Sequence, residues 1–274
     1  MDGTSAMHDR YRKHKDGVSG SHAEVLRGIE LLKRHQVEYN IMAVINDYNV
    51  SDPIGFYRYL KSLGSDFIQF TPIVERILPD GHLAHIESRE YSTVHEHSVS
   101  PARWGDFLCA TFNEWVRHDV GRVFVQLFDA TLTNWMGVAP GLYTMAQYCG
   151  HAGALEHDGT LYSCDHFVFD AYMLGNIRRQ SILELMNSPR QIQFGRDKYD
   201  FLPRQCREWL YLFACWGECP KNRFARDRYG ERGLNYLCEG CYQFFEYVAP
   251  YMDRMKELLQ NQLPPSKIMQ DINS

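Results

Sequence analysis

The sequence lacks three features that would place it in common classes of protein. No stretch approaches the roughly 20 apolar residues that a membrane span needs, although 45% of the 274 residues are hydrophobic. The N-terminus, MDGTSAMHDRYRKHK, has no apolar signal-peptide core. The formal net charge is -5, whereas a nucleic-acid-binding protein needs a basic face. These absences predict a cytoplasmic protein that binds neither a membrane nor a nucleic acid.

The first 138 residues alternate between helical and strand patterns. Ser21 and Glu24 are spaced as a capping box, and Pro53 after Asp52 is placed as a first-turn proline. Such alternation predicts βαβ units and a parallel sheet. The strands are too few to close a barrel, so we expect the sequence to begin within a fold. The predicted helices span about 21–35, 53–64 and 100–118, and the predicted strands span 37–45, 66–72 and 122–128.

The character of the sequence changes after residue 140. Gly, Cys, Asp and Asn punctuate short segments as far as about Tyr236, and helical periodicity returns over 242–259. We expect metal ligation to stabilise so loop-rich a region. The polar segment 75–99 is predicted to be a loop, and its histidines (His82, His85, His95 and His97) are interpreted as solvated rather than metal-binding.

Seven of the eight cysteines fall between Cys149 and Cys241. Stable disulfides are rare in the cytoplasm, and closely spaced thiolates can reach one metal together. Soft thiolates favour zinc or an iron–sulfur cluster, and spacing alone does not separate the two. The alternative, a set of reduced core cysteines, suits Cys109 on its amphipathic helix but does not explain the pairs. The candidate ligands are Cys149, Cys164, Cys206, Cys215, Cys219, Cys238 and Cys241.

Four parts of the sequence carry a family resemblance, and they follow one another along most of the chain. They are DGTSAMHDRYRK (2–13), FIQFTPIVER (67–76), CGHAGALEHDGTLYSCDHFVFDAYMLGNI (149–177), and LPRQCREWLYLFACWGECPKNRF (202–224) with LNYLCEGCYQFFEY (234–247). In these parts the chain resembles the anaerobic sulfatase-maturating enzymes, which are radical-SAM proteins. The resemblance implies an α/β fold: an incomplete parallel β/α radical-SAM barrel (1–138), a loop-rich SPASM domain ending in a helix (139–262), and a flexible tail (263–274).

The resemblance implies up to two auxiliary [4Fe–4S] clusters. It assigns Cys149, Cys164 and Cys219 to the first cluster, and Cys206, Cys215 and Cys238 to the second. The family pattern has a further cysteine in each set, at positions where this chain has Tyr143 and Trp209. We therefore expect incomplete clusters. Cys241, where the family often has an aromatic residue, is a candidate to supply a missing ligand.

The resemblance also implies a bound S-adenosyl-L-methionine. Arg12 matches an arginine that contacts its carboxylate in relatives, and a guanidinium suits that contact because it binds carboxylates bidentately. Val74 and Gln69 correspond to a strand end near the adenosine. The bland alternatives are a solvated Arg12 and simple packing for the other two. Family members also carry C-x-x-x-C-x-x-C for the radical-generating cluster, and residues 1–274 contain no such triplet.

Asp165, next to Cys164, matches the family's catalytic base, which takes a proton after hydrogen abstraction from the substrate. A carboxylate beside a cluster suits that role, although an aspartate capping a turn is the commoner reading of such a residue. The function implied is oxidation of a Cys or Ser in a sulfatase polypeptide to Cα-formylglycine, with this polypeptide inactive by itself because it is N-terminally truncated. The rivals are a non-catalytic remnant that binds clusters or sulfatase, and a zinc-stabilised interaction module.

Overall fold

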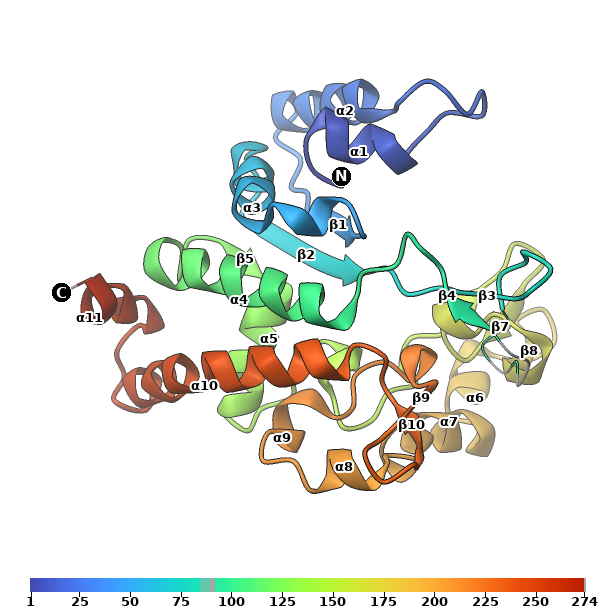
Figure 1. The fold of residues 1–274 in the computed structure, drawn as a ribbon. Helices are drawn as coiled ribbons and strands as arrows, with labels where there is room; N and C mark the ends of the chain where they lie inside the picture. Colours follow the sequence, from blue (N-terminus) through green and yellow to red (C-terminus); the bar gives the residue numbers. More distant parts are fainter. Residues whose placement is uncertain (85, 87, 89–91, 274) are drawn as a thin grey trace. The chain divides into compact units, whose positions relative to one another are not determined.

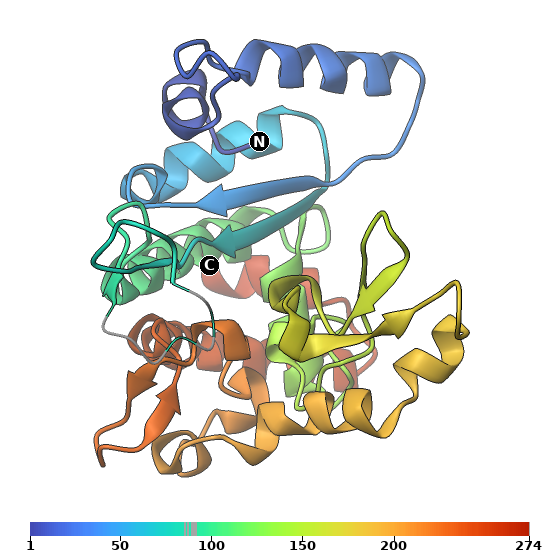
Figure 2. The ribbon, with the colours of Figure 1, turned by 90° about the vertical axis from the view of Figure 1, so that its right-hand side faces the viewer.

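The computed structural model describes residues 1–84, 86, 88 and 92–273. The chain divides into two compact units (Figures 1 and 2). Unit 1 consists of residues 1–84, 89–138 and 239–274, and unit 2 of residues 85–88 and 139–238. The domain bounds expected from the sequence, 1–138, 139–262 and 263–274, stay a prediction.

Unit 1 is built on a parallel sheet whose strands run in the order β1-β2-β5. Strand β2 lies between the other two and pairs in parallel with each of them. Ile68 of β2 lies opposite Ile41 of β1, and Phe67 of β2 lies opposite Phe124 of β5. The connections between the strands are helical, so the predicted α/β fold with an incomplete parallel β/α barrel is confirmed. The strands are β1 (Ile41–Ile45), β2 (Phe67–Pro72) and β5 (Phe124–Val125); the helices are α1 (Ser5–Tyr11), α2 (His22–Arg34), η1 (Asn49–Ser51), α3 (Pro53–Ser62), α4 (Pro101–His118) and α5 (Gln126–Trp135).

Local chemistry explains where these elements begin. Asp52 accepts a hydrogen bond from the Gly55 N–H at 3.0 Å and Pro53 occupies the first turn, as predicted for α3. The predicted capping box at Ser21 was wrong: its hydroxyl donates to the Arg12 carbonyl at 3.0 Å instead of capping α2. The strand predicted over 122–128 is also shorter, because Gln126 already begins α5.

The last two helices belong to unit 1. Helix α10 (Cys238–Gln260) buries an apolar face that includes Phe244 and Met252. Residues expected to form a flexible tail instead form η6 (Pro265–Lys267) and α11 (Ile268–Asn273). Ile268 is only 1% exposed, and Arg254 pairs with Asp271 at 2.7 Å. The polar composition of this segment favoured a tail, whereas the burial of Ile268 holds it against the rest of unit 1.

Unit 2 has little regular structure, as its sequence predicted. Its one three-stranded antiparallel sheet runs in the order β6-β7-β8, and its longest helix is α7. In unit 1, the polar segment expected as a loop contains a short antiparallel pair, β3 (Arg76–Ile77) with β4 (Thr93–Val94). The elements of unit 2 are η2 (Tyr143–Met145), β6 (Ala154–Leu155), β7 (Thr160–Tyr162), η3 (Asp165–Phe167), η4 (Asp170–Tyr172), β8 (Met173–Asn176), α6 (Ile182–Met186), α7 (Pro189–Asp200), α8 (Arg204–Arg207), α9 (Leu212–Cys215), η5 (Pro220–Asn222), β9 (Ala225–Arg226) and β10 (Arg232–Leu234).

Candidate metal centre

Three cysteines of unit 2 line one cavity of about 180 Å³. They are Cys149, Cys164 and Cys219, and the charge on Cys164 is coupled to each of the other two thiols. Burial raises the pKa of Cys164 and of Cys219 to about 12, so both are neutral thiols when no metal is bound. A soft metal would bind them with release of protons. The structure thus brings together the three residues that the family pattern assigns to the first cluster.

A second group of cysteines gathers in the same unit. Cys206 lies in α8, Cys215 ends α9, and Cys238 is the first residue of α10. Cys238 is coupled electrostatically to both of the others, and burial raises the pKa of Cys206 and of Cys238 to about 12. These are the three residues assigned to the second cluster.

The positions without the expected thiols also have defined places. Tyr143 lines the first cavity, and the backbone N–H of Trp209 donates to the Cys206 carbonyl at 3.2 Å. Cys241 is 5% exposed on α10, in unit 1. Each group in unit 2 therefore offers three soft ligands, a donor set that fits an iron–sulfur cluster with one non-thiol position. Ligation by Cys241 stays a prediction.

One face of α7 holds the backbone around the first cavity. The Gln191 side chain, 1% exposed, donates to the carbonyls of Gly150 and Ser163, which flank Cys149 and Cys164. The Cys149 N–H donates to the Gly195 carbonyl at 3.3 Å, and a side chain at Gly195 would collide with the Cys149 backbone. The spacing of Gln191 and Gly195 is one helical turn. Sequence reasoning missed both residues, because their partners are carbonyl groups distant in sequence.

Asn235 connects the two groups of cysteines. Its buried side-chain amide donates to the Cys219 backbone carbonyl at 3.2 Å. Its backbone carbonyl accepts a hydrogen bond from the Cys238 N–H at 3.0 Å. One residue therefore fixes the backbone at a cysteine of each group. A buried residue that makes hydrogen bonds to the backbone of both groups contributes rigidity as well as stability.

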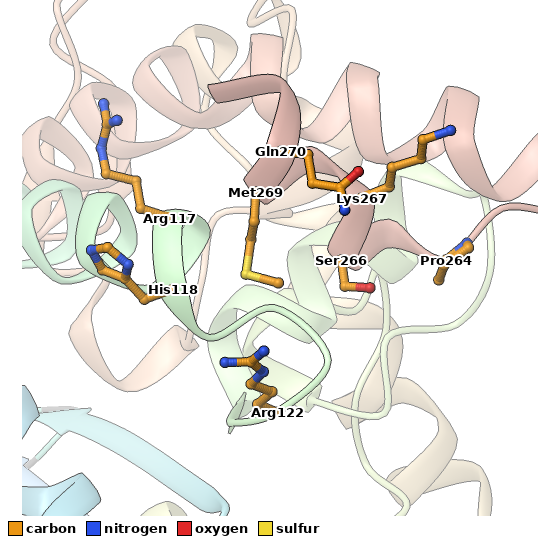
Figure 3. A pocket seen from close by; sticks show the side chains of 8 residues that line it. All are labelled: Arg117, His118, Arg122, Pro264, Ser266, Lys267, Met269 and Gln270. Atoms are coloured by element: carbon orange, nitrogen blue, oxygen red, sulfur yellow. The ribbon is translucent and has the colours of Figure 1, made fainter. Parts of the chain in front are cut away.

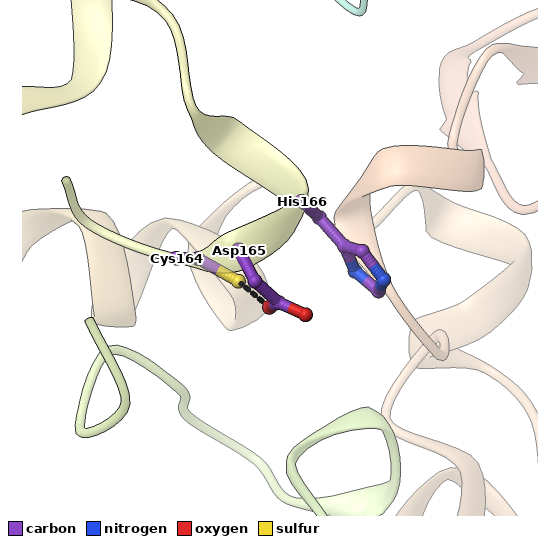
Figure 4. A group of neighbouring side chains, drawn as sticks. All are labelled: Cys164, Asp165 and His166. Carbon is purple, nitrogen blue, oxygen red and sulfur yellow. Dashed lines mark hydrogen bonds between the residues drawn. The ribbon is translucent and has the colours of Figure 1, made fainter. Parts of the chain in front are cut away.

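Asp165 is one of the residues that line the first cavity, and its role as a base stays a prediction. Its carboxylate accepts a hydrogen bond from the Cys164 thiol at 3.2 Å (Figure 4). Burial alone would raise the pKa of Asp165, but the Cys164 hydrogen bond, the nearby His166 and backbone N–H groups together lower it. Asp165 is thus held ionised and able to accept a proton.

His166 extends this cluster toward Cys219. Its Nδ1 lies 3.3 Å from Cys219 Sγ. One ligand atom from each of Cys164, Asp165 and His166 lies within 4.8 Å of the others, and in the described part of the chain no other three His, Cys, Asp or Glu side chains come so close. That the histidines over 82–97 do not bind a metal stays a prediction, and His85 lies outside the described residues.

The residues predicted to bind S-adenosylmethionine all lie in unit 1. Arg12 Nε pairs with the buried Asp2 carboxylate at 2.6 Å, and its side chain remains 49% exposed. Gln69 lies within β2 and Val74, 3% exposed, follows that strand. The Val74 side chain thus packs in the core of unit 1. Contact between these residues and the ligand stays a prediction.

Unit 1 also contains a cavity of about 590 Å³, lined by residues of α4, the turn after it and the C-terminal segment. Four of its lining residues are basic or can become so: Arg117, His118, Arg122 and Lys267. Figure 3 shows the charged ends of Arg117 and Lys267 pointing in different directions. The cavity therefore does not focus its positive charge on one point.

Comparison with known proteins agrees with this geometry. Residues 149–209 match the SPASM family, described as an iron–sulfur cluster-binding domain. The chain is 55% identical, over 98% of its length, to a serine-type anaerobic sulfatase-maturating enzyme of Bacteroides thetaiotaomicron, and 30% identical over 94% to one of Klebsiella pneumoniae. It spans 66% and 60% of those two relatives.

A solved structure, native anSMEcpe with bound AdoMet and Cp18Cys peptide, superposes with a TM-score of 0.80 at 26% identity. The superposition covers 94% of this chain and 68% of that one. A parallel β/α unit joined to a SPASM cysteine unit defines a protein of the radical-SAM class. Within that class, the chain belongs to the family of anaerobic sulfatase-maturating enzymes. Among the residues that the structure describes, no helix is long and apolar enough to cross a membrane.

Proposed function

We propose that this chain takes part in the oxidation of a sulfatase serine or cysteine to Cα-formylglycine, and that unit 2 holds the auxiliary clusters of that reaction. The observation that carries the proposal is the cavity in which Cys149, Cys164 and Cys219 meet beside the ionised Asp165. Cys149, Cys164 and Asp165 lie within the SPASM match, and Cys219 lies beyond its end. The relative at 55% identity is a serine-type enzyme, which favours a serine substrate, whereas the relatives at 30% identity are of both the serine and the cysteine type.

The chain's own residues have separable roles in this proposal. Cys149, Cys164 and Cys219 would hold one cluster, and Cys206, Cys215 and Cys238 the other. When bound, S-adenosylmethionine and the clusters supply hydrogen-atom abstraction and electron uptake. Asp165 would accept the proton from the substrate hydroxyl or thiol. After loss of a hydrogen atom and an electron as well, a serine gives the aldehyde directly, whereas a cysteine gives a thioaldehyde that water converts to the aldehyde with release of hydrogen sulfide. The ligand set of the radical-generating cluster is not encoded in residues 1–274, so this polypeptide supplies substrate binding, the base and the auxiliary sites.

A cytoplasmic location is part of the same proposal. All eight cysteines are free thiols in the structure, and thiolate ligands survive best in a reducing compartment. A sulfatase would therefore meet this protein as an unfolded or partly unfolded chain, since the reacting residue must enter the cavity beside Asp165.

A second candidate is binding of one divalent ion, such as zinc, as a structural module. It is favoured by one observation, the closeness of His166 Nδ1 to Cys219 Sγ at 3.3 Å. Two ligands of one tetrahedral ion, with bonds of about 2.1 and 2.3 Å, lie at a similar separation. Metal analysis separates the two candidates directly.

The test is anaerobic reconstitution of the full chain with iron and sulfide, followed by titration with a serine-containing sulfatase peptide. We expect iron and sulfide in similar amounts, and tighter peptide binding by the loaded chain than by the metal-free chain. Asp165→Asn should leave iron content unchanged, as should the control Asp170→Asn at a nearby exposed aspartate. One zinc per chain with no sulfide would reject the cluster proposal and support the second candidate.

A further inference from the structure

Lys198 is a buried cation that bonds to the backbone of two residues lining the first cavity, Tyr143 and Thr144. It lies about two helical turns beyond Gln191 on the same face of α7, and it is 1% exposed. Its ammonium group donates to the carbonyls of Tyr143, at 2.7 Å, Thr144, at 2.9 Å, and Ala146. These carbonyls belong to the turn that carries Tyr143, the position of the expected fourth thiol. All three ammonium donors are used, so Lys198 fixes that turn in place.

Arg223 performs the same task on the loop between the two groups of cysteines. Residues Trp216, Gly217 and Glu218, between Cys215 and Cys219, all have positive φ angles of 48°, 67° and 55°. Three consecutive left-handed residues, two of them not glycine, are costly without support. Arg223 donates to the carbonyl of each of the three, at 2.7, 2.9 and 3.1 Å. The loop thus depends on this guanidinium for its shape.

The two cations are joined to each other through the backbone. Arg223 Nη1 also donates to the carbonyl of Lys198. The turn at 143–146, helix α7 and the loop at 216–218 are therefore one hydrogen-bonded assembly. It touches Cys149 and Cys219 of the first group and ends beside Cys215 of the second. We call Lys198 and Arg223 the cation pair.

In the described part of the chain, one carboxylate, that of Glu218, acts electrostatically on both members of the cation pair. Two like charges this close, and mostly out of water, oppose each other, and a buried charge without a counter-charge is expensive. Glu218 can balance only one of the two positive charges. Thiols are the other groups that act on the pair: Cys149 and Cys215 on Lys198, and Cys206, Cys215 and Cys219 on Arg223. Those thiols become negative only when they bind a metal.

We propose that the cation pair is a positioning and counter-charge element shared by the two cysteine sites. Its positive charge balances metal-bound thiolates of both groups, and its hydrogen bonds fix the turn at Tyr143 and the loop at 216–218. The two sites are thereby coupled, because metal-bound thiolates of either group interact with the same two cations. This inference rests on the proposed function, because it requires thiolate ligation in unit 2.

The decisive variants change the charge or only the geometry of the cation pair. Lys198→Met removes the charge and keeps the length of the side chain, whereas Lys198→Arg keeps the charge. Arg196→Met is the matched control, because Arg196 is an exposed cation on the same helix. Each chain is reconstituted anaerobically with iron and sulfide, analysed for both elements, and titrated electrochemically while the cluster absorbance and electron paramagnetic resonance are recorded.

We expect Lys198→Met to shift the midpoint potential of the clusters to more negative values, since a nearby positive charge favours the reduced, more negative cluster. We also expect iron affinity to fall about 10-fold to 100-fold, as for other outer-shell partners of metal ligands. Lys198→Arg should keep the midpoint potential of the clusters close to that of the parent, while its affinity for iron should stay below the parent's. Arg196→Met should match the parent in both measurements.

Three outcomes separate the possibilities. If Lys198→Met loses stability but its clusters keep the parent's potential, Lys198 only supports the fold and the counter-charge proposal is overturned. If Lys198→Met does not fold, Lys198→Arg decides: a potential shifted as far as that of a neutral variant such as Arg223→Gln would also overturn it. If the parent chain itself binds no iron and sulfide, the proposed function fails, and that result is visible before any variant is compared.

Discussion

Gly105 on α4 and Gly240 on α10 face each other with no side chain between the two helices. A Cβ atom added to Gly240 would lie 2.7 Å from the Gly105 nitrogen, and one added to Gly105 would lie 2.9 Å from the Gly240 Cα. Both contacts are with backbone, which cannot move aside as a flexible side chain can. The first turns of α10 therefore pack directly against the backbone of α4.

The first prediction follows from this contact. Gly240→Ala should destabilise the protein by about 1–3 kcal/mol, the usual cost of overpacking. The matched control is Gly28→Ala on α2, where an added Cβ meets nothing within 4 Å. That change should be neutral or stabilising by up to about 1 kcal/mol, because alanine favours the helix. Thermal unfolding of both variants measures the difference. Equal midpoint temperatures for Gly240→Ala and Gly28→Ala would contradict the packing argument.

The second prediction concerns the missing thiols. Tyr143→Cys should raise the iron and sulfide bound after anaerobic reconstitution, because Tyr143 lines the first cavity and a fourth thiolate would complete its ligand set. Tyr148→Cys is the control, since Tyr143 and Tyr148 are both 44% exposed on the same segment. Trp209→Cys should act in the same way on the second site. Equal iron in Tyr143→Cys and Tyr148→Cys would mean that another group already fills the fourth position.

The third prediction is that metal removal unfolds unit 2 before unit 1. Unit 2 has short strands and many loops, so the free energy of ligation is a large part of its folding free energy. Unit 1 has an aromatic core of its own, in which Phe56, Phe107 and Phe128 are fully buried. After treatment with a chelator, limited proteolysis should cut first within 139–238. Fragment patterns that are the same with and without chelator would show that packing alone maintains unit 2.

The fourth prediction is a pH dependence of stability in unit 1. Burial raises the pKa of Asp129 to about 7, and its Oδ2 has no hydrogen-bond partner among the described residues. Between about pH 4 and pH 7 the unfolded chain loses this proton and the folded protein keeps it, so stability falls as pH rises. Asp129→Asn removes that loss. At pH 8 it should be more stable than the parent by on the order of 2 kcal/mol, and near pH 4 the two should agree.

Thermal unfolding across this pH range measures the difference. Asp66→Asn, at an exposed position on the same unit, serves as the control and should follow the parent at every pH. A constant difference between Asp129→Asn and the parent from pH 4 to pH 8 would show that Asp129 has an ordinary pKa in the folded protein.

The fifth prediction is that the polypeptide of residues 1–274, by itself, does not cleave S-adenosylmethionine. Radical formation needs a cluster with an open iron that binds the cofactor, and structural sites are closed in the way that catalytic ones are not. The first cysteine of the sequence, Cys109, is partly buried on α4, and burial raises its pKa to about 12. The assay is anaerobic incubation with dithionite, with the Bacteroides relative as the positive control. Catalytic amounts of 5′-deoxyadenosine from the pure chain would contradict the prediction.

The sequence predicted the parts of this structure that depend on spacing. Hydrophobic periodicity located the parallel strands and helices, and the spacing of cysteines indicated metal ligation. It did not reveal Gln191, Lys198 or Arg223, because each bonds to carbonyl groups, which every residue has. The Ser21 capping box failed for a related reason: the Arg12 carbonyl competes for the same hydroxyl. Tertiary partners of this kind leave no pattern in a single sequence.

The order of the cysteines along the chain has a consequence for biosynthesis. Cys149 and Cys164 belong to the first group, Cys206 and Cys215 to the second, and then Cys219 returns to the first before Cys238 completes the second. Neither group is complete until most of unit 2 has left the ribosome. The loop at 216–218, with its positive φ angles, connects Cys215 of the second group to Cys219 of the first. A nascent chain therefore cannot finish one site and then begin the next. If the two groups hold clusters as proposed, the first cannot be loaded before Cys219 has been translated, nor the second before Cys238, and a ribosome that stalls earlier leaves a thiol-rich chain exposed to oxidation.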